Sequence, residues 1–190
     1  MRKTGSEKSE KYQAYFLDPY NNPKHQEIIY RDLEFPIGWF TEDHQLGNGR
    51  IIAISRTKNG ERKLLGAIQF VPLKRNERIR LRRVPYALLR IFSARANVGF
   101  YKKHNRSVGD ELLAIMQKNV KSPLVYVTSG LSPQGEKLLR RNSKQFKKEP
   151  IYDPNLGHAP LGSLTRHTYS GLLKNKKPKL RISRMKPLSS

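Results

Sequence analysis

The chain of 190 residues contains no cysteine, which excludes a disulfide framework and any metal site built on thiolates. It also lacks the run of about 18 apolar residues that a membrane-spanning helix needs. Its opening residues are polar and mix both signs of charge, which is typical of neither a secretory signal nor an acid-poor transit peptide. These absences predict a soluble, cytoplasmic protein that does not enter a membrane.

Acidic residues are scarce: 15 Asp and Glu stand against 38 Lys and Arg, giving a formal net charge of +23. No acid follows Asp153, and the stretch from Lys74 to Arg106 contains eleven Lys or Arg and one acid. Such an excess repels itself in a compact state, so we expect it to serve a polyanionic partner. Nucleic acid is favoured over a membrane surface, and a general solubility surface is the alternative.

Two basic stretches supply the predicted nucleic-acid contacts, because Lys and Arg neutralise phosphates and release their counterions. In the first stretch these residues are Lys74, Arg75, Arg78, Arg80, Arg82 and Arg83. In the second they are Lys174, Lys176, Lys177, Lys179 and Arg181. The second stretch lies in a proline-containing, apolar-poor segment, which predicts a disordered basic tail over residues 172–190. A flexible arm is predicted at 1–11 and a single domain at 12–171.

Strand patterns occur at 12–17, 50–55, 64–71, 86–93 and 124–128, with weaker ones at 146–152 and 164–169. Asn59-Gly60 predicts a hairpin between the second and third strands. Both hairpin strands are apolar at successive positions, which predicts a sheet covered on both faces. The predicted class is therefore α/β or α+β, with a mixed, mainly antiparallel sheet flanked by helices.

Residues 107–120 carry the strongest helical pattern, with an apolar stripe through Val108, Leu112 and Met116. Ser107 is a fitting N-cap for this helix, and two acids follow it in the first turn. Shorter helices are predicted at 25–33 and at 133–141. We expect the helix that begins after Ser107 to pack across the sheet.

Few residue patterns point to chemistry. The five histidines are scattered without helical ligand spacing, so no metal site is predicted, and neither a nucleophile elbow nor a Walker loop is present. The remaining candidate is the predicted loop from Tyr101 to Asp110, which opens the strongest helix. A helix N-terminus suits a pyrophosphate, and Lys102, Lys103, His104 and Arg106 would add charge-assisted hydrogen bonds. An ordinary basic loop is the alternative.

The order of the predicted elements over residues 12–152 resembles the Gcn5-related N-acetyltransferase (GNAT) family. That family binds acyl-CoA through an Arg/Gln-x-x-Gly-x-Gly/Ala loop, and the matching run here is His104-Asn105-Arg106-Ser107-Val108-Gly109. Gly109 matches the last glycine, whereas Ser107 replaces the first and His104 replaces the Arg or Gln. The resemblance implies that acetyl-CoA or another acyl-CoA is held by His104, Arg106, Ser107, Val108, Gly109 and Asp110.

The resemblance also implies acyl transfer to an amine, but Leu139 occupies the position of the tyrosine that commonly serves the family as general acid. Ser129 and Tyr101 are the candidate catalytic residues in its place. Two functions stay open. One is a GNAT-like acyltransferase that acts on or near nucleic acid or nucleoprotein. The other is a non-enzymatic basic nucleic-acid-binding protein, such as a virion, ribosome-associated or regulatory factor.

Overall fold

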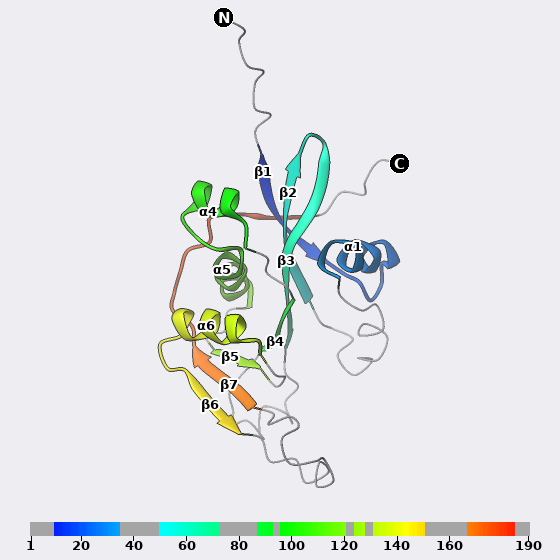
Figure 1. Ribbon diagram of the computed structural model, residues 1–190. Helices are drawn as coiled ribbons and strands as arrows, with labels where there is room; N and C mark the ends of the chain where they lie inside the picture. The colour runs from blue at the N-terminus through cyan, green and yellow to red at the C-terminus, as the bar shows by residue number, and fades with distance from the viewer. Residues whose placement is uncertain are drawn as a thin grey trace, which may run out of the picture.

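The computed structural model describes residues 10–34, 50–72, 87–92, 96–120, 124–127, 131–150 and 167–184. They form one eight-stranded sheet in the order β6-β7-β5-β4-β3-β2-β1-β8 (Figure 1). The strands are β1 Lys11–Leu17, β2 Arg50–Lys58, β3 Glu61–Pro72, β4 Ala87–Phe92, β5 Leu124–Val127, β6 Lys147–Pro150, β7 His167–Leu172 and β8 Ile182–Arg184. The pairs β4–β5 and β1–β8 are parallel and the other neighbours are antiparallel. The α+β class with a mixed, mainly antiparallel sheet is confirmed.

The predicted hairpin forms between β2 and β3. Its turn residues Asn59 and Gly60 have φ angles of 54° and 84°, as a two-residue turn of type I′ requires. In β2, the four successive residues Ile51 to Ile54 are completely buried. They alternate between the hydrophobic clusters on the two faces of the sheet. The prediction of a sheet covered on both faces is therefore confirmed.

Helices cover the two faces unequally (Figure 1). Helix α1, Pro23–Leu33, lies on one face, where Ile29 and Leu33 pack against β1, β2 and β3. The other face carries α4 Val98–His104, α5 Val108–Val120 and α6 Pro133–Asn142. Val108, Leu112 and Met116 of α5 are at most 2% exposed, as the apolar stripe predicted. Helix α5 is the central support of this face.

Helix α4 corrects the prediction of a loop over residues 101–110. The side chain of Asn97 accepts a hydrogen bond from the backbone N–H of Phe100 at 2.7 Å and caps the helix start. Asn105, with a φ of 48°, ends the helix in the left-handed conformation. Lys102, Lys103 and His104 therefore lie on a helix. The apolar pattern gave little sign of it, because Phe100 is its only fully buried side chain.

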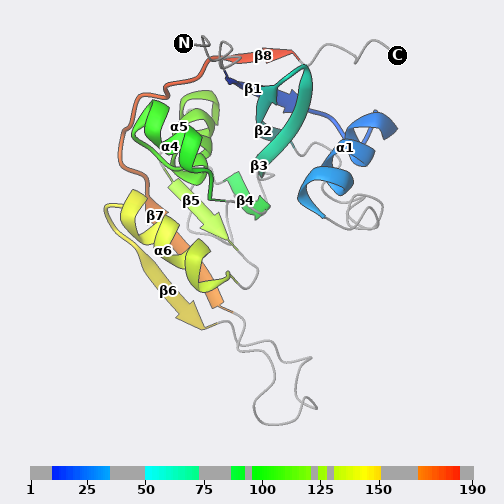
Figure 2. The same cartoon turned by 45° about the horizontal axis from the view of Figure 1, so that its top comes forward.

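The C-terminal segment corrects a second prediction, the disordered tail over residues 172–190. Residues 174–181, which we call the strap, run past α6, α5 and α4 (Figure 2) and lead into β8. Strand β8 pairs with β1, and Leu180 and Ile182 pack against the core. The tail is therefore ordered as far as Arg184, because two apolar side chains and a strand partner hold it. Residues 185–190 and residues 1–9 of the predicted N-terminal arm lie outside the described residues.

Candidate functional site

The first turn of α5 lies at a distinctive position in the sheet. Helix α5 belongs to the crossover between the parallel strands β4 and β5, so its N-terminus lies toward their carboxyl ends. Those two strands pair only at Ala87 with Val125 and at Leu88 with Tyr126. Within the described ranges, the rest of β4 is paired only with β3. A helix N-terminus at the carboxyl ends of parallel strands is a common place for an anionic ligand.

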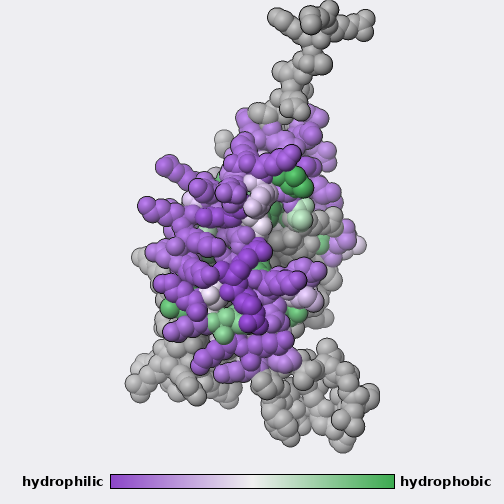
Figure 3. All heavy atoms as spheres, turned by 60° about the vertical axis from the view of Figure 1, so that its left-hand side comes forward, coloured by the Kyte–Doolittle hydropathy of each residue, from purple (hydrophilic) through white to green (hydrophobic). Residues whose placement is uncertain are grey.

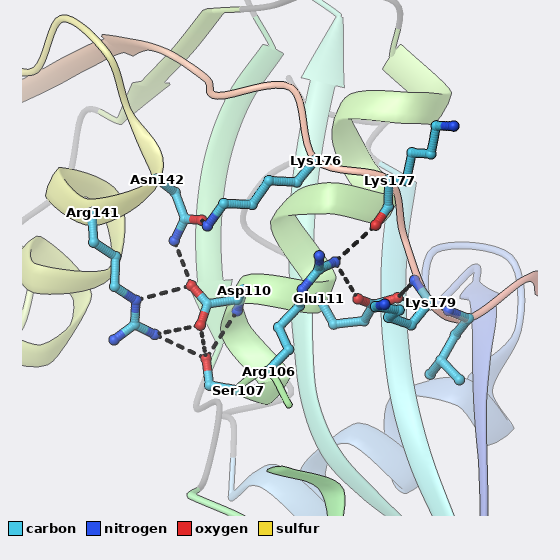
Figure 4. Close-up of polar contacts among 10 residues, drawn as sticks. Arg106, Ser107, Asp110, Glu111, Arg141, Asn142, Lys176, Lys177 and Lys179 are labelled. Carbon is cyan, nitrogen blue, oxygen red and sulfur yellow. Dashed lines mark hydrogen bonds and ion pairs between the residues drawn. The ribbon is translucent and has the colours of Figure 1, made fainter. Parts of the chain in front are cut away.

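Ser107 caps this helix as predicted. Its hydroxyl oxygen accepts a hydrogen bond from the backbone N–H of Asp110 at 3.1 Å, and the hydroxyl donates to Asp110 Oδ2 at 2.6 Å. From α6, Arg141 places its Nε 2.9 Å from Asp110 Oδ1 and its Nη2 2.9 Å from Oδ2 (Figure 4). Asn142 donates to the same Oδ1 at 2.6 Å. The start of α5 is thereby tied to the end of α6.

These contacts determine the charge of Asp110. Burial acts to raise the pKa of its carboxyl, but hydrogen bonds from Arg141, Asn142 and Ser107 outweigh burial and hold the pKa below its ordinary value. Asp110 is therefore ionised at neutral pH, and its charge is matched by the bidentate guanidinium of Arg141. A carboxylate in the first helical turn also interacts favourably with the helix dipole.

The neighbouring acid, Glu111, holds the strap. Its side chain is fully buried, and its Oε2 lies 2.7 Å from Nη1 of Arg106. Its Oε1 accepts hydrogen bonds from the backbone N–H groups of Lys179 at 2.5 Å and Leu180 at 2.7 Å (Figure 4). Arg106 also donates to the carbonyl oxygen of Lys177 at 3.0 Å. We call this set of contacts around Glu111 the latch.

Further contacts fix the earlier part of the strap to α6. The Lys176 ammonium donates to Asn142 Oδ1 at 2.7 Å, and the backbone N–H of Lys174 donates to the carbonyl oxygen of Asn142 at 2.8 Å. Lys174 Nζ donates to the carbonyl oxygen of Arg141 at 2.9 Å. Sequence reasoning missed Glu111, Arg141 and Asn142 as site residues. The Arg-Arg-Asn run at 140–142 was the available signal, but it does not identify a partner on another helix.

The six residues expected to hold acyl-CoA come together, but several turn inward. Val108 and Gly109 are buried, Asp110 is bound by Arg141, and Arg106 is committed to Glu111. Arg106 and Ser107 keep partial exposure, and Asn105 between His104 and Arg106 is exposed. A phosphate group therefore has access to this turn from residues 105–107, and not over Gly109.

His104 lies in a ring cluster. Its imidazole centroid is 4.6 Å from that of Phe100 and 5.6 Å from that of Tyr12. Burial lowers the pKa of His104 below its ordinary value, with nearby Lys103 and Lys179 adding to the effect and Glu111 opposing it. Its Nε2 is buried without a hydrogen-bond partner in the part of the chain that the structure describes. The ring is thus neutral at neutral pH and serves packing rather than charge.

The other predicted site residues are dispersed. Tyr101 is 55% exposed on α4, whereas Ser129 lies outside the described residues. The predicted nucleic-acid contacts at residues 74–83 also lie outside them. On the strap, four of the five predicted contacts are exposed and Lys176 is partly so; the exposed ones are Lys174, Lys177, Lys179 and Arg181.

Two further observations concern the described part of the chain. It contains no group of three or more His, Cys, Asp or Glu residues placed to hold a metal ion. None of its helices combines the length and the apolar character needed to cross a membrane.

One solved structure is similar to this chain in fold. It is a GNAT-family acetyltransferase from Bacillus anthracis, to which the chain is similar with 12% sequence identity and a TM-score of 0.37. The match covers 86% of this chain and 93% of the other. No protein-family profile and no curated protein sequence matches the chain. At this level of similarity the likeness concerns the fold alone.

Proposed function

We propose that the protein transfers an acyl group from an acyl-CoA to an amine. The observation that carries the proposal is the parallel β4–β5 pair, which is joined at two residue positions and has the N-terminus of α5 toward its carboxyl ends. The order of the elements along the chain supports it, because a strand, a capped helix and a parallel strand follow the Asn-Gly hairpin as the GNAT resemblance implies.

Acyl-CoA needs two kinds of contact, and this region has candidates for both. Its pyrophosphate suits the partial positive charge at the N-terminus of α5, which it would approach past residues 105–107. Its amide-bearing arm suits the edge of β4 beyond Leu88, because a strand edge offers backbone donors and acceptors. When bound, the thioester supplies the activated acyl group. In this proposal, Tyr101 and Ser129 are the candidates for moving the proton of the attacking amine.

A test of the cofactor site uses the capping serine. Asp and Asn cap helices about as well as Ser. In Ser107→Asp, however, an added negative charge lies where the pyrophosphate would bind. We expect Ser107→Asp to abolish the heat of CoA and acetyl-CoA binding in calorimetry, and Ser107→Asn to retain it. Ser132→Asp, the same change at the N-cap of α6, is the matched control, and thermal melting checks that each variant folds.

The proposal fails if the wild-type protein does not bind CoA or acetyl-CoA at millimolar ligand, or if Ser107→Asp and Ser132→Asp bind equally well. If binding is confirmed, release of CoA thiol in the presence of amines tests the reaction. Tyr101→Phe and Ser129→Ala should then lower kcat while leaving the affinity for CoA unchanged. Loss of affinity in either variant would assign that residue to binding instead.

A further inference from the structure

One face of the molecule, over α4, α5, α6 and the strap, is almost entirely hydrophilic (Figure 3). The described segments that build it are residues 96–120, 131–150 and 167–184. Together they contain sixteen Lys and Arg and only four acids, namely Asp110, Glu111, Glu136 and Glu149. We call this surface the basic face.

Internal ion pairs use three of the four acids. Asp110 pairs with Arg141 and Glu111 with Arg106. Glu136 pairs with Arg140 at 3.0 Å and with Lys148 at 3.1 Å. The remaining lysines and arginines therefore create a positive potential that these carboxylates do not cancel. Such a surface attracts a polyanion.

The strap arranges part of this charge in a row. The latch and Asn142 fix its backbone, whereas the side chains of Lys174, Lys177, Lys179 and Arg181 are exposed. Its eight residues span at most about 25 Å, at up to about 3.6 Å per residue. One strand of a duplex carries a phosphate about every 3.4 Å of its axis, so a row of this length meets several phosphates. Because the backbone of the strap is already fixed, binding loses less conformational entropy there.

We propose that the basic face binds the phosphate backbone of nucleic acid, with the strap as a rigid row of contacts. The proposal goes beyond acyl transfer and does not depend on it. A membrane is the less suitable partner, because interfacial binding needs an apolar side to bury. The only exposed large hydrophobic residues in the described ranges are Tyr30, Val98 and Tyr101. Tyr101 lies beside Lys102 and Lys103 on α4, where an exposed ring can stack on a base.

A variant of the latch distinguishes binding by the fixed row from a simple effect of net charge. Glu111→Gln makes the protein one unit more positive, so attraction by charge alone predicts tighter binding. Gln has a single acceptor oxygen, so either Arg106 or the two strap N–H groups would face an amide NH2 donor and lose their partner. If the row must be held in place, the loosened latch makes the same variant bind more weakly. The second result is the one we expect.

A second pair of variants removes equal charge from different places. Lys177→Ala/Lys179→Ala takes two charges from the strap, where only backbone atoms of these residues contact the latch. Lys24→Ala/Lys63→Ala takes two exposed charges from α1 and the far end of the hairpin. Thermal melting identifies any variant that fails to fold, and the alanine pairs keep the test valid if Glu111→Gln is such a variant.

The experiment titrates labelled duplex DNA, duplex RNA and single strands with the full chain at several salt concentrations, and anionic phospholipid vesicles alongside. We expect the strap variant to flatten the dependence of log affinity on log salt by about 1.8 on duplex DNA, similarly for all sequences. The control pair should change it much less. Equal effects of the two pairs, unchanged or tighter binding by Glu111→Gln, or binding to vesicles but to no nucleic acid would overturn the proposal.

Discussion

The Oε2 of Glu111 lies 2.7 Å from Nη1 of Arg106, with the Glu111 side chain fully buried and the Arg106 side chain 16% exposed. Removing two charges from water is costly, and their attraction compensates only when the remaining lone pairs are also satisfied. Two backbone N–H groups of the strap satisfy the second oxygen of Glu111. The first turn of α5 and the strap therefore depend on each other.

Deleting residues 174–190 should destabilise the whole domain. The deletion leaves the Glu111 carboxylate without its two backbone donors, and a charged group that loses its partners costs about 1–3 kcal/mol or more. Thermal melting followed by circular dichroism measures the effect. Deleting only residues 185–190 keeps the strap and β8 and is the control. An unchanged melting temperature in the longer deletion would show that the latch contributes nothing to stability.

Leu112→Ala should reduce the free energy of unfolding by about 2–5 kcal/mol, because it leaves a cavity at a fully buried position between α5 and the sheet. Urea unfolding measures the change. Lys118→Ala, at an exposed position of the same helix, should stay within about 0.5 kcal/mol of the wild type. A small effect at Leu112 would mean that α5 is not packed on the sheet as described.

Gly60→Ala should destabilise the protein by about 1–2 kcal/mol through the backbone alone. Gly60 has a φ of 84°, which L-residues rarely adopt, and no atom lies within 4 Å of the position that a Cβ would take. Asn59→Gly is the control, since glycine adopts the φ of 54° at that position freely. Urea unfolding of both variants decides the point, and equal stabilities would contradict the assigned turn.

Removing His104 should change how stability depends on pH. The unfolded chain binds a proton at His104 near pH 6.5, whereas burial lowers the pKa of the folded ring. Below about pH 6.5 the unfolded state therefore binds more protons, and stability falls as the pH drops toward the folded pKa. In His104→Phe, which keeps a ring against Phe100 and Tyr12, this loss between pH 7.5 and 5.5 should be smaller. Urea unfolding at the two pH values tests it, and an identical pH dependence would refute it.

Much of the sheet was predictable because its signals are local. The Asn59-Gly60 turn, the apolar runs of β2 and β3 and the stripe of α5 each lie within a few residues of sequence. Strand β8 was not predictable in this way, since its three residues pair with β1 at Ala14, Tyr15 and Phe16, far away in the sequence. Strands this short depend on a partner more than on their own composition.

In the candidate site, too, the features with a local signal were predictable and those that depend on a distant partner were not. The capping role of Ser107 follows from its position before the helix, and the sequence was sufficient for it. The partners of the next two acids come from elsewhere: Arg141 lies 31 residues after Asp110, and Lys179 lies 68 residues after Glu111. A count of charges predicted free cations at this turn, but the fold pairs one of them, Arg106, with Glu111, an acid that pattern reasoning assigned only to the helix dipole.

Strand β8 has a consequence for the order in which the fold can be completed. It follows every other described element in the chain, yet it pairs with β1, the first. Domains begin to fold during synthesis from their N-terminal side. A nascent chain therefore holds β1 with an open backbone edge, and Glu111 without its strap donors, until residues 179–184 have left the ribosome. We therefore expect this seam between the first and last described strands to close late in assembly, and until then the edge of β1 is open to pairing with another chain.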